Sequence, residues 1–297
     1  MDRRDFLLTS LALPALPGLV AHGARFVARP RFGCAAITWG GRDDVAIDEI
    51  AALGYRGIQL RTAAFDRWGA TPQALRELLA VRALTFVAFS SGTLRLDPAT
   101  FEDDMALHTK HARFVQACGG TFLQVVDERP RGRAPTASDF AAMARRLSAL
   151  GSRVADLGVT LVYHNHMGAL GQGPDEVEAV LAASDARQVR LLLDIAHYQQ
   201  GGGDPVAAVR RYADRIAFLH LKDVHRLAPA DAGKPAYRFV ELGRGEVDVK
   251  GVLSALAGIG YDGWGIVELD AVTDPSLTPR ACAQRSKDFL ASAGYPL

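Results

Sequence analysis

The sequence predicts a single-domain α/β protein in which eight strand–helix units close into a (β/α)8 TIM barrel. Short β-rich runs alternate with helical patterns through residues 31–297, and no linker or change in composition divides them. The strands are nearly continuous apolar runs, which is typical of parallel strands covered on both faces. The first strand–helix turn also lacks the glycine-rich motif that an open dinucleotide-binding sheet usually carries. A closed barrel of ordinary size fits these observations best.

The apolar runs predict eight strands, at residues 34–39, 58–60, 85–90, 122–126, 160–164, 189–194, 216–220 and 265–268. Helical patterns follow them, at residues 45–53, 73–81, 101–117, 139–157, 174–183, 205–212, 249–257 and 279–291. Several helices begin near a proline, and Gly119-Gly120 follows the third helix. These are the residues expected at helix starts and ends. Residues 225–247 contain glycine and proline, and we expect a loop there.

Charge and cysteine content exclude several classes of partner and site. The formal net charge is +1, and the arginines and lysines are scattered along the chain. This argues against a nucleic-acid partner or an anionic membrane surface. The three cysteines, Cys34, Cys118 and Cys282, are far apart and contain no CxxC pair. They therefore indicate neither a disulfide framework nor a zinc knuckle, and we expect them to be buried as small hydrophobic residues.

Residues 1–24 do not fit the barrel pattern. Arg3-Arg4 precedes Phe6-Leu7, and a short apolar stretch interrupted by two prolines follows, ending in small residues. The stretch is too short and too broken to span a bilayer as a helix. The segment resembles a twin-arginine export signal, which implies a bacterial protein exported folded into the periplasm. The alternative interpretation is a disordered or amphipathic N-terminal arm.

Ionisable side chains recur where the last four predicted strands end. They are His164 and His166 after the fifth strand, Asp194 and His197 after the sixth, His220 and Lys222 after the seventh, and Glu268 and Asp270 after the eighth. The strand ends of a parallel barrel open onto one mouth, where barrel enzymes build their active sites. Because most of these groups are about one βα repeat apart, we expect them to be neighbours around the rim.

Two imidazoles and two carboxylates at one mouth predict a site for a divalent metal ion. This donor set suits Mn²⁺, Co²⁺, Zn²⁺ or Fe²⁺. Burying Asp194 and Glu268 together without a cation would place two like charges in a low-dielectric pocket, at a cost of the order of several kcal/mol. A metal ion removes that cost.

Each of these residues also has a simpler interpretation. A single histidine at a strand end is often only a satisfied hydrogen-bonding group. Lys222 and Asp223 could form a salt bridge at the rim, and Gln59 could cap the end of the second strand. The glycine-rich turn at residues 243–245 could hold a phosphate or be an ordinary turn.

Five segments together resemble the xylose isomerase-like barrel superfamily, which includes sugar phosphate isomerases/epimerases and inosose dehydratases. They are YHNHMG (163–168), LLLDIAH (191–197), HLKDV (220–224), LGRGEVD (242–248) and GWGIVELD (263–270). The resemblance covers residues 31–295, and the first segment is most similar to the inosose dehydratase branch.

The resemblance implies one metal ion held from strands five to eight, by His164, Asp194, His220 and Glu268. His164 stands where epimerases of the superfamily have a metal-binding glutamate. A neutral imidazole ligand cannot act as the carboxylate base that two-base epimerisation needs. Gln59 is a second departure, since relatives often have a glutamate there, and it removes a possible charge from the pocket floor.

The chemistry that the resemblance implies is removal of a proton next to a carbonyl of a keto-sugar, keto-glycoside or inosose, with the metal stabilising the enediolate. The strand-five histidine favours elimination or hydration over isomerisation or epimerisation. His166 and His197 are the candidate bases or acids, since imidazole ordinarily titrates near neutral pH. Lys222 could stabilise an oxyanion. The candidate substrate-binding residues are Trp39, by stacking on a sugar ring, Gln59 and Asp270.

Two interpretations from other classes remain open. A DNA-repair endonuclease can use the same barrel, but it would need more metal ligands and a basic face. A non-catalytic, exported sugar-binding barrel would keep the metal set without turnover. For both elimination and isomerisation or epimerisation, the expected partner is a small carbohydrate, and a homo-oligomer is possible.

Overall fold

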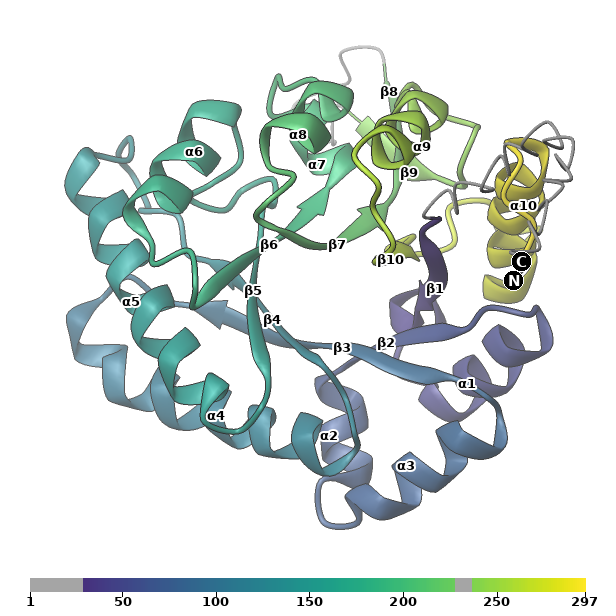
Figure 1. The fold of residues 1–297 in the computed structure, drawn as a ribbon, viewed down its shortest axis with the longest axis horizontal. Helices are drawn as coiled ribbons and strands as arrows, with labels where there is room; N and C mark the ends of the chain where they lie inside the picture. Colours follow the sequence, from purple (N-terminus) through teal and green to yellow (C-terminus); the bar gives the residue numbers. More distant parts are fainter. Residues whose placement is uncertain (1–28, 228–236) are drawn as a thin grey trace, which may run out of the picture.

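A computed structural model describes residues 29–227 and 237–297 of the chain, and the predicted export signal lies outside them. Eight parallel strands close into a barrel in the order β1-β10-β7-β6-β5-β4-β3-β2, as Figure 1 shows. They are β1 (Arg31–Ala35), β2 (Gly57–Arg61), β3 (Thr85–Leu94), β4 (Phe122–Asp127), β5 (Thr160–His164), β6 (Val189–Asp194), β7 (Ile216–Leu221) and β10 (Trp264–Val267). The predicted (β/α)8 barrel is confirmed.

Helices surround the barrel on its outer side (Figure 1). They are α1 (Asp43–Ala52), α2 (Thr62–Trp68), α3 (Pro72–Val81), α4 (Phe101–Ala117), α5 (Ala137–Ala155), α6 (Pro174–Ala183), α7 (Ile195–Gln200), α8 (Pro205–Arg211), α9 (Val249–Gly258) and α10 (Pro279–Ser292). Four of them begin at a proline, whose fixed φ suits the first helical turn and whose missing N–H is not needed there. Among the described residues, no helix is both long and apolar enough to cross a membrane.

A layer of apolar side chains fills the barrel beneath its C-terminal mouth. It contains Ala35, Val87, Ala88, Val162, Leu192, Phe218, Trp264 and Ile266. Four of these lie two residues before a predicted ligand and therefore on the same face of the strand: Val162 before His164, Leu192 before Asp194, Phe218 before His220, and Ile266 before Glu268. The polar residues at the mouth therefore lie directly above a buried apolar layer.

Close packing at the other end of the barrel explains one glycine. A Cβ at Gly57 would lie 2.7 Å from the Trp264 ring and 2.7 Å from the Val87 side chain. The Trp264 ring also stacks under the Arg31 guanidinium, at 4.5 Å. Only glycine lets β2 approach this ring, which closes the bottom of the barrel.

The first strand is shorter than the sequence predicts. β1 ends at Ala35, and Ala36–Trp39 form a 3-10 helix that ends at Gly40 in a left-handed conformation (φ 63°). The cause is Trp39, which is buried and whose indole N–H donates to Glu49 on α1 at 2.6 Å. An extended chain could not deliver this side chain to the α1 side of the barrel.

The prediction of a loop over residues 225–247, of which residues 228–236 lie outside the described part of the chain, is wrong in part. β8 (Asp223–Arg226) pairs antiparallel with β9 (Tyr237–Val240) in a separate two-stranded sheet. α2 and α7 were also absent from the predicted elements. Both are shorter than two full turns, so they leave little hydrophobic periodicity in the sequence.

The hydrogen bonds of Asp223 show whether the turn at residues 243–245 is free to bind a phosphate or is an ordinary turn. Its carboxylate accepts hydrogen bonds from the backbone N–H groups of Gly243, Gly245 and Val247, at 2.9, 2.9 and 3.0 Å. These donors are therefore not available to a phosphate, and the segment is an ordinary turn. The predicted alternative of a Lys222–Asp223 salt bridge is wrong, because Lys222 pairs with other carboxylates.

Candidate metal centre

The structure brings the four predicted ligands together at the C-terminal mouth. His164, Asp194 and His220 end β5, β6 and β7 or lie one residue from the end, and Glu268 directly follows β10. His220 Nδ1 lies 3.4 Å from Asp194 Oδ2 and 3.3 Å from Glu268 Oε1. His164 Nε2 lies 3.6 Å from the same Asp194 oxygen. These strands are neighbours in the barrel, so each contributes one side chain to a common centre.

Three of the facing atoms are buried and have no hydrogen-bond partner among the described residues. They are His164 Nε2, Asp194 Oδ2 and His220 Nδ1. Buried polar atoms without a partner are rare in folded proteins. The potential ligand atoms of Asp194, His220 and Glu268 lie within 4.8 Å of one another, and so do those of His164, Asp194 and His197. A nitrogen- and oxygen-ligated divalent cation fits this donor set.

The backbone explains why one oxygen of Asp194 is left free. Asp194 is the N-cap of α7, and its Oδ1 accepts hydrogen bonds from the N–H groups of Ala196 and His197 at 3.0 and 2.9 Å. The Asn165 side chain bonds both the N–H and the C=O of Asp194. One carboxylate oxygen is thus used by the helix, and the other is fixed toward the centre.

Lys222 is a buried cation behind the centre. Its ammonium lies 3.0 Å from Glu268 Oε1 and 2.6 Å from Asp270 Oδ1. Burial opposes its protonation, but Glu268, Asp194 and Asp270 outweigh burial and raise the pKa of Lys222 above its ordinary value. It is fully buried and does not line the cavity. Direct contact of Lys222 with a developing oxyanion is therefore not supported by this geometry.

Both carboxylates of the centre are ionised at neutral pH. Burial raises the pKa of Asp194, but His197 and Lys222 more than compensate and hold it well below the usual range. For Glu268, burial is likewise outweighed by His220 and Lys222, so the pKa of Glu268 falls to about 2. One lysine thus faces two buried carboxylates and Asp270, and negative charge remains for a cation to balance.

The two candidate bases differ in their surroundings. Burial, with Lys222 at 3.5 Å, holds the pKa of His197 well below its ordinary value in spite of nearby Asp194. His166 is half-buried and lines the cavity, and its Nδ1 contacts the Met167 carbonyl at 2.7 Å. Because a carbonyl only accepts, Nδ1 carries the proton and Nε2 keeps a free lone pair. His166 is the better placed base.

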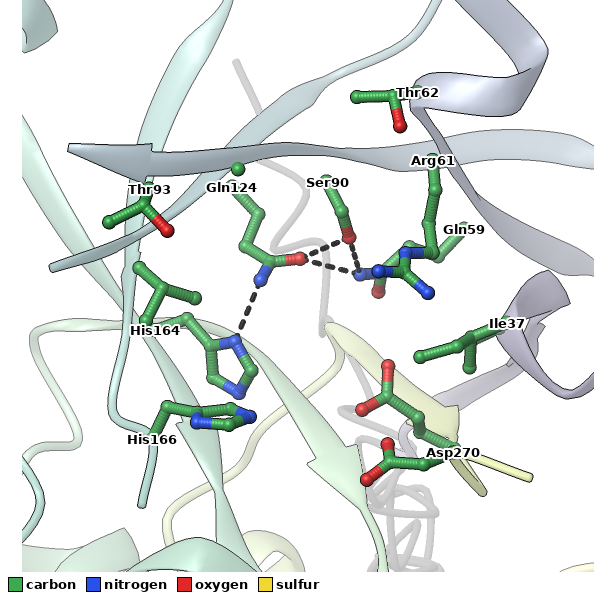
Figure 2. Close-up of a pocket in the computed structure, with 14 residues that line it drawn as sticks. Ile37, Gln59, Arg61, Thr62, Ser90, Thr93, Gln124, His164, His166 and Asp270 are labelled. Carbon is green, nitrogen blue, oxygen red and sulfur yellow. Dashed lines mark hydrogen bonds between the residues drawn. The ribbon is translucent and has the colours of Figure 1, made fainter. Parts of the chain in front are cut away.

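A cavity of about 230 Å³ opens beside the centre. His164, His166, Glu268 and Asp270 line one side of it, and Arg61, Thr62, Ser90 and Thr93 line the other, as Figure 2 shows for most of them. Most of the lining residues carry hydroxyl, amide, imidazole or charged groups, and Ala35, Ile37 and Val126 add apolar surface, a combination that suits a sugar-like ligand.

The structure corrects a second predicted site residue, Trp39, and adds others. Trp39 does not line the cavity, because its ring is buried and bonded to Glu49, so stacking on a sugar ring from this position is wrong. Ile37, from the same segment, lines the cavity instead. Gln59 lines it as predicted, and Gln124 and Arg61 were missed. Gln124 could have been suspected as a polar residue inside the apolar run of β4.

Comparisons with known sequences agree with this architecture. A family model described as a xylose isomerase-like TIM barrel matches residues 47–293. An inosose dehydratase from Lacticaseibacillus casei is 31% identical over 272 residues, covering 82% of this chain and 87% of the relative. The rhizopine catabolism protein MocC from Rhizobium meliloti is 37% identical over 188 residues, covering 59% of this chain and 56% of that protein.

Solved structures share the fold at low identity. The IolI protein, solved with a bound zinc atom, superposes with a TM-score of 0.75 at 17% identity, covering 89% of this chain and 99% of IolI. A probable 3-DHS dehydratase, AsbF from Bacillus anthracis, superposes with a TM-score of 0.72 at 15% identity, covering 88% and 98% of the two chains. The family match and the inosose dehydratase relative together show that the chain belongs to the xylose isomerase-like TIM barrel family.

Proposed function

We propose that this enzyme of the xylose isomerase-like family removes a proton next to the carbonyl of a keto-sugar, keto-glycoside or inosose, and eliminates water or an alcohol from the neighbouring carbon. The observation that carries the proposal is the set of unpartnered ligand atoms beside the free Nε2 of His166, in one polar cavity. The similarity to inosose dehydratases, at 31% identity, supports the dehydratase outcome.

The donor set fits one divalent ion. Asp194, His220 and Glu268 would hold it, and His164 Nε2 faces the same point from β5. When bound, such an ion would polarise the substrate carbonyl and stabilise the negative charge that develops on its oxygen. Zn²⁺, Mn²⁺, Co²⁺ and Fe²⁺ all suit these ligands.

The protein's own residues would move the proton. His166 Nε2 takes the proton from the α carbon, the electron pair forms a carbon–carbon double bond, and the departing oxygen receives a proton as it leaves. The protonated His166 can supply that second proton. Lys222 keeps Glu268 ionised and pairs with Asp270, and the hydroxyl and guanidinium groups across the cavity would bind the substrate.

His164, at the end of β5, favours elimination over epimerisation. Two-base epimerisation needs an effective general acid or base on each face of the substrate, and β5 offers His164. Burial lowers the pKa of His164 to about 4, so the ring is neutral and a weak base at neutral pH. His166 also lines the cavity, and its free Nε2 is not one of the unpartnered ligand atoms of the centre.

The metal site predicts a defined effect of ligand substitution. The purified protein should bind about one divalent ion, and His220→Ala or Asp194→Ala should weaken binding by about 10-fold or more, because each removes a direct bond. Metal content by elemental analysis and competition with a chelator measure this. The control is His225→Ala, an exposed histidine paired with Glu246 outside the centre. A metal-free native protein with full activity would contradict the site.

The reaction predicts a product that has lost a group. With a substrate, deuterium at the α carbon should slow turnover and a conjugated enone should accumulate. His166→Ala should lower kcat by about 100-fold or more while metal content stays unchanged, since a general base contributes about 10² to 10⁴. Glu268→Gln should abolish turnover and weaken metal binding together. Entry of solvent deuterium into a product that retains all its groups would instead identify an isomerase or epimerase.

We also propose that the chain is exported by the twin-arginine pathway, from Arg3-Arg4 followed by Phe6-Leu7. Replacing both arginines with lysine should retain the protein in the cytoplasm, because the signal depends on the arginine pair. Cell fractionation with immunodetection measures the distribution. An unchanged periplasmic yield in this variant would exclude the twin-arginine route.

A further inference from the structure

Two glutamines connect the two histidines of the metal centre on their far side. His220 Nε2 contacts Gln59 Oε1 at 2.8 Å. Gln59 Nε2 contacts Gln124 Oε1 at 2.7 Å, and Gln124 Nε2 contacts His164 Nδ1 at 2.7 Å. All four side chains are buried. We call Gln59 and Gln124 the glutamine relay; Figure 2 shows both amides bonded to each other and to Ser90, and Gln124 bonded to His164.

The hydrogen bonds along the glutamine relay all run in the same donor-to-acceptor direction, from one histidine to the other. Every hydrogen bond needs one donor and one acceptor, and a side-chain amide offers N–H on one side and oxygen on the other. As the amides stand, Gln59 donates to Gln124, so His220 Nε2 must donate to Gln59 and His164 Nδ1 must accept from Gln124. If both amides turn over, every bond reverses. His220 Nε2 then accepts, and His164 Nδ1 donates. This holds for either assignment of amide oxygen and nitrogen.

The direction fixes where each ring carries its proton. A neutral imidazole has one N–H. In the first direction both rings are protonated on Nε2, and in the reversed direction both are protonated on Nδ1. The relay therefore couples His164 and His220 to the same tautomer.

Metal binding by both rings requires opposite tautomers. His164 faces the centre with Nε2, whereas His220 faces it with Nδ1. A ligand nitrogen must be free of its proton. His164 must then be protonated on Nδ1 and His220 on Nε2, which the intact relay forbids. Gln124 would have to turn over alone, which breaks its bond from Gln59. The Ser90 hydroxyl, which accepts from Gln59 at 2.9 Å and donates to Gln124 at 2.5 Å, would also have to stop donating to Gln124 and accept from it instead.

We infer that the bond between Gln59 and Gln124 allows only one of the two histidines to be a ready metal ligand at a time, and that His220 is that ligand in the orientation seen here. Gln59 and Gln124 are positioning residues, and the inference rests on the proposed metal site. His164 joins the ligand set only when the relay breaks, so its bond to the metal is weak. A weakly held ligand leaves a coordination position that a substrate oxygen can take.

A carboxylate in the relay removes the conflict. The side chain in Gln59→Glu would accept from His220 Nε2–H on one side and from Gln124 N–H on the other. The Gln124 oxygen would then face His164, whose proton would move to Nδ1. Both rings would present a free nitrogen to the centre. Glutamate has nearly the volume of glutamine, so the packing is preserved.

The tautomers can be measured in the metal-free protein. With ¹⁵N-labelled histidine, nitrogen–proton correlation spectra at a pH where both rings are neutral should show His164 and His220 in the same tautomer. Signals are assigned with His164→Asn and His220→Asn. In Gln59→Glu the two rings should show opposite tautomers, and in Gln116→Glu, an exposed position on α4, they should not change. Opposite tautomers in the unsubstituted protein would overturn the inference.

A double-mutant cycle on Co²⁺ binding tests the consequence for the metal. His164→Ala should weaken Co²⁺ binding about 10-fold more in the Gln59→Glu background than in the unsubstituted protein, because no buried hydrogen bond must break there. The charge that Gln59→Glu adds is present both with and without His164→Ala, so its effect on Co²⁺ affinity cancels from the cycle. Equal losses in the two backgrounds would overturn the inference. Failure of every variant to bind Co²⁺ would overturn the metal site itself, whereas the tautomer spectra test the relay without metal.

Discussion

Two buried carboxylates, Asp194 and Glu268, share one ammonium, Lys222, at the mouth of the barrel. Lys222 lies 3.0 Å from Glu268 and 3.9 Å from Asp194, and it also pairs with the half-exposed Asp270 at 2.6 Å. A buried lysine can offset one negative charge but not three. The remaining charge faces two imidazole nitrogens that have no hydrogen-bond partner within residues 29–227 and 237–297. A divalent cation supplied from outside the chain would complete the balance.

The surrounding fold orients the ligand side chains from three sides. From below, the apolar layer of the barrel excludes water and gives each ligand the same strand parity. From the outside, α7 and Asn165 occupy one oxygen and the backbone of Asp194, which leaves a single oxygen to point inward. From β2 and β4, the glutamine relay binds the far nitrogens of the histidines. Each ligand is therefore oriented by a contact unrelated to the metal.

The sequence predicted the architecture and the main ligands because both depend on periodic features. Eight apolar runs determine the barrel, and charged groups at successive strand ends must meet at one mouth. The details that it missed depend on single contacts. Trp39 turns outward to reach Glu49, which ends β1 early. Gln124 is one polar residue in an apolar strand, and nothing in its spacing links it to Gln59. The burial of Lys222 behind Glu268 follows from the path of the chain after β7, which no local pattern encodes.

The central claim is that a metal ion lies between Asp194, His220 and Glu268. The most direct measurement is X-ray diffraction at the cobalt absorption edge, from crystals of the protein loaded with Co²⁺. The account predicts one anomalous peak within about 2.0–2.3 Å of Asp194 Oδ2, His220 Nδ1 and Glu268 Oε1. Absence of a peak at the barrel mouth, or a peak only beside exposed groups such as His225, would contradict it.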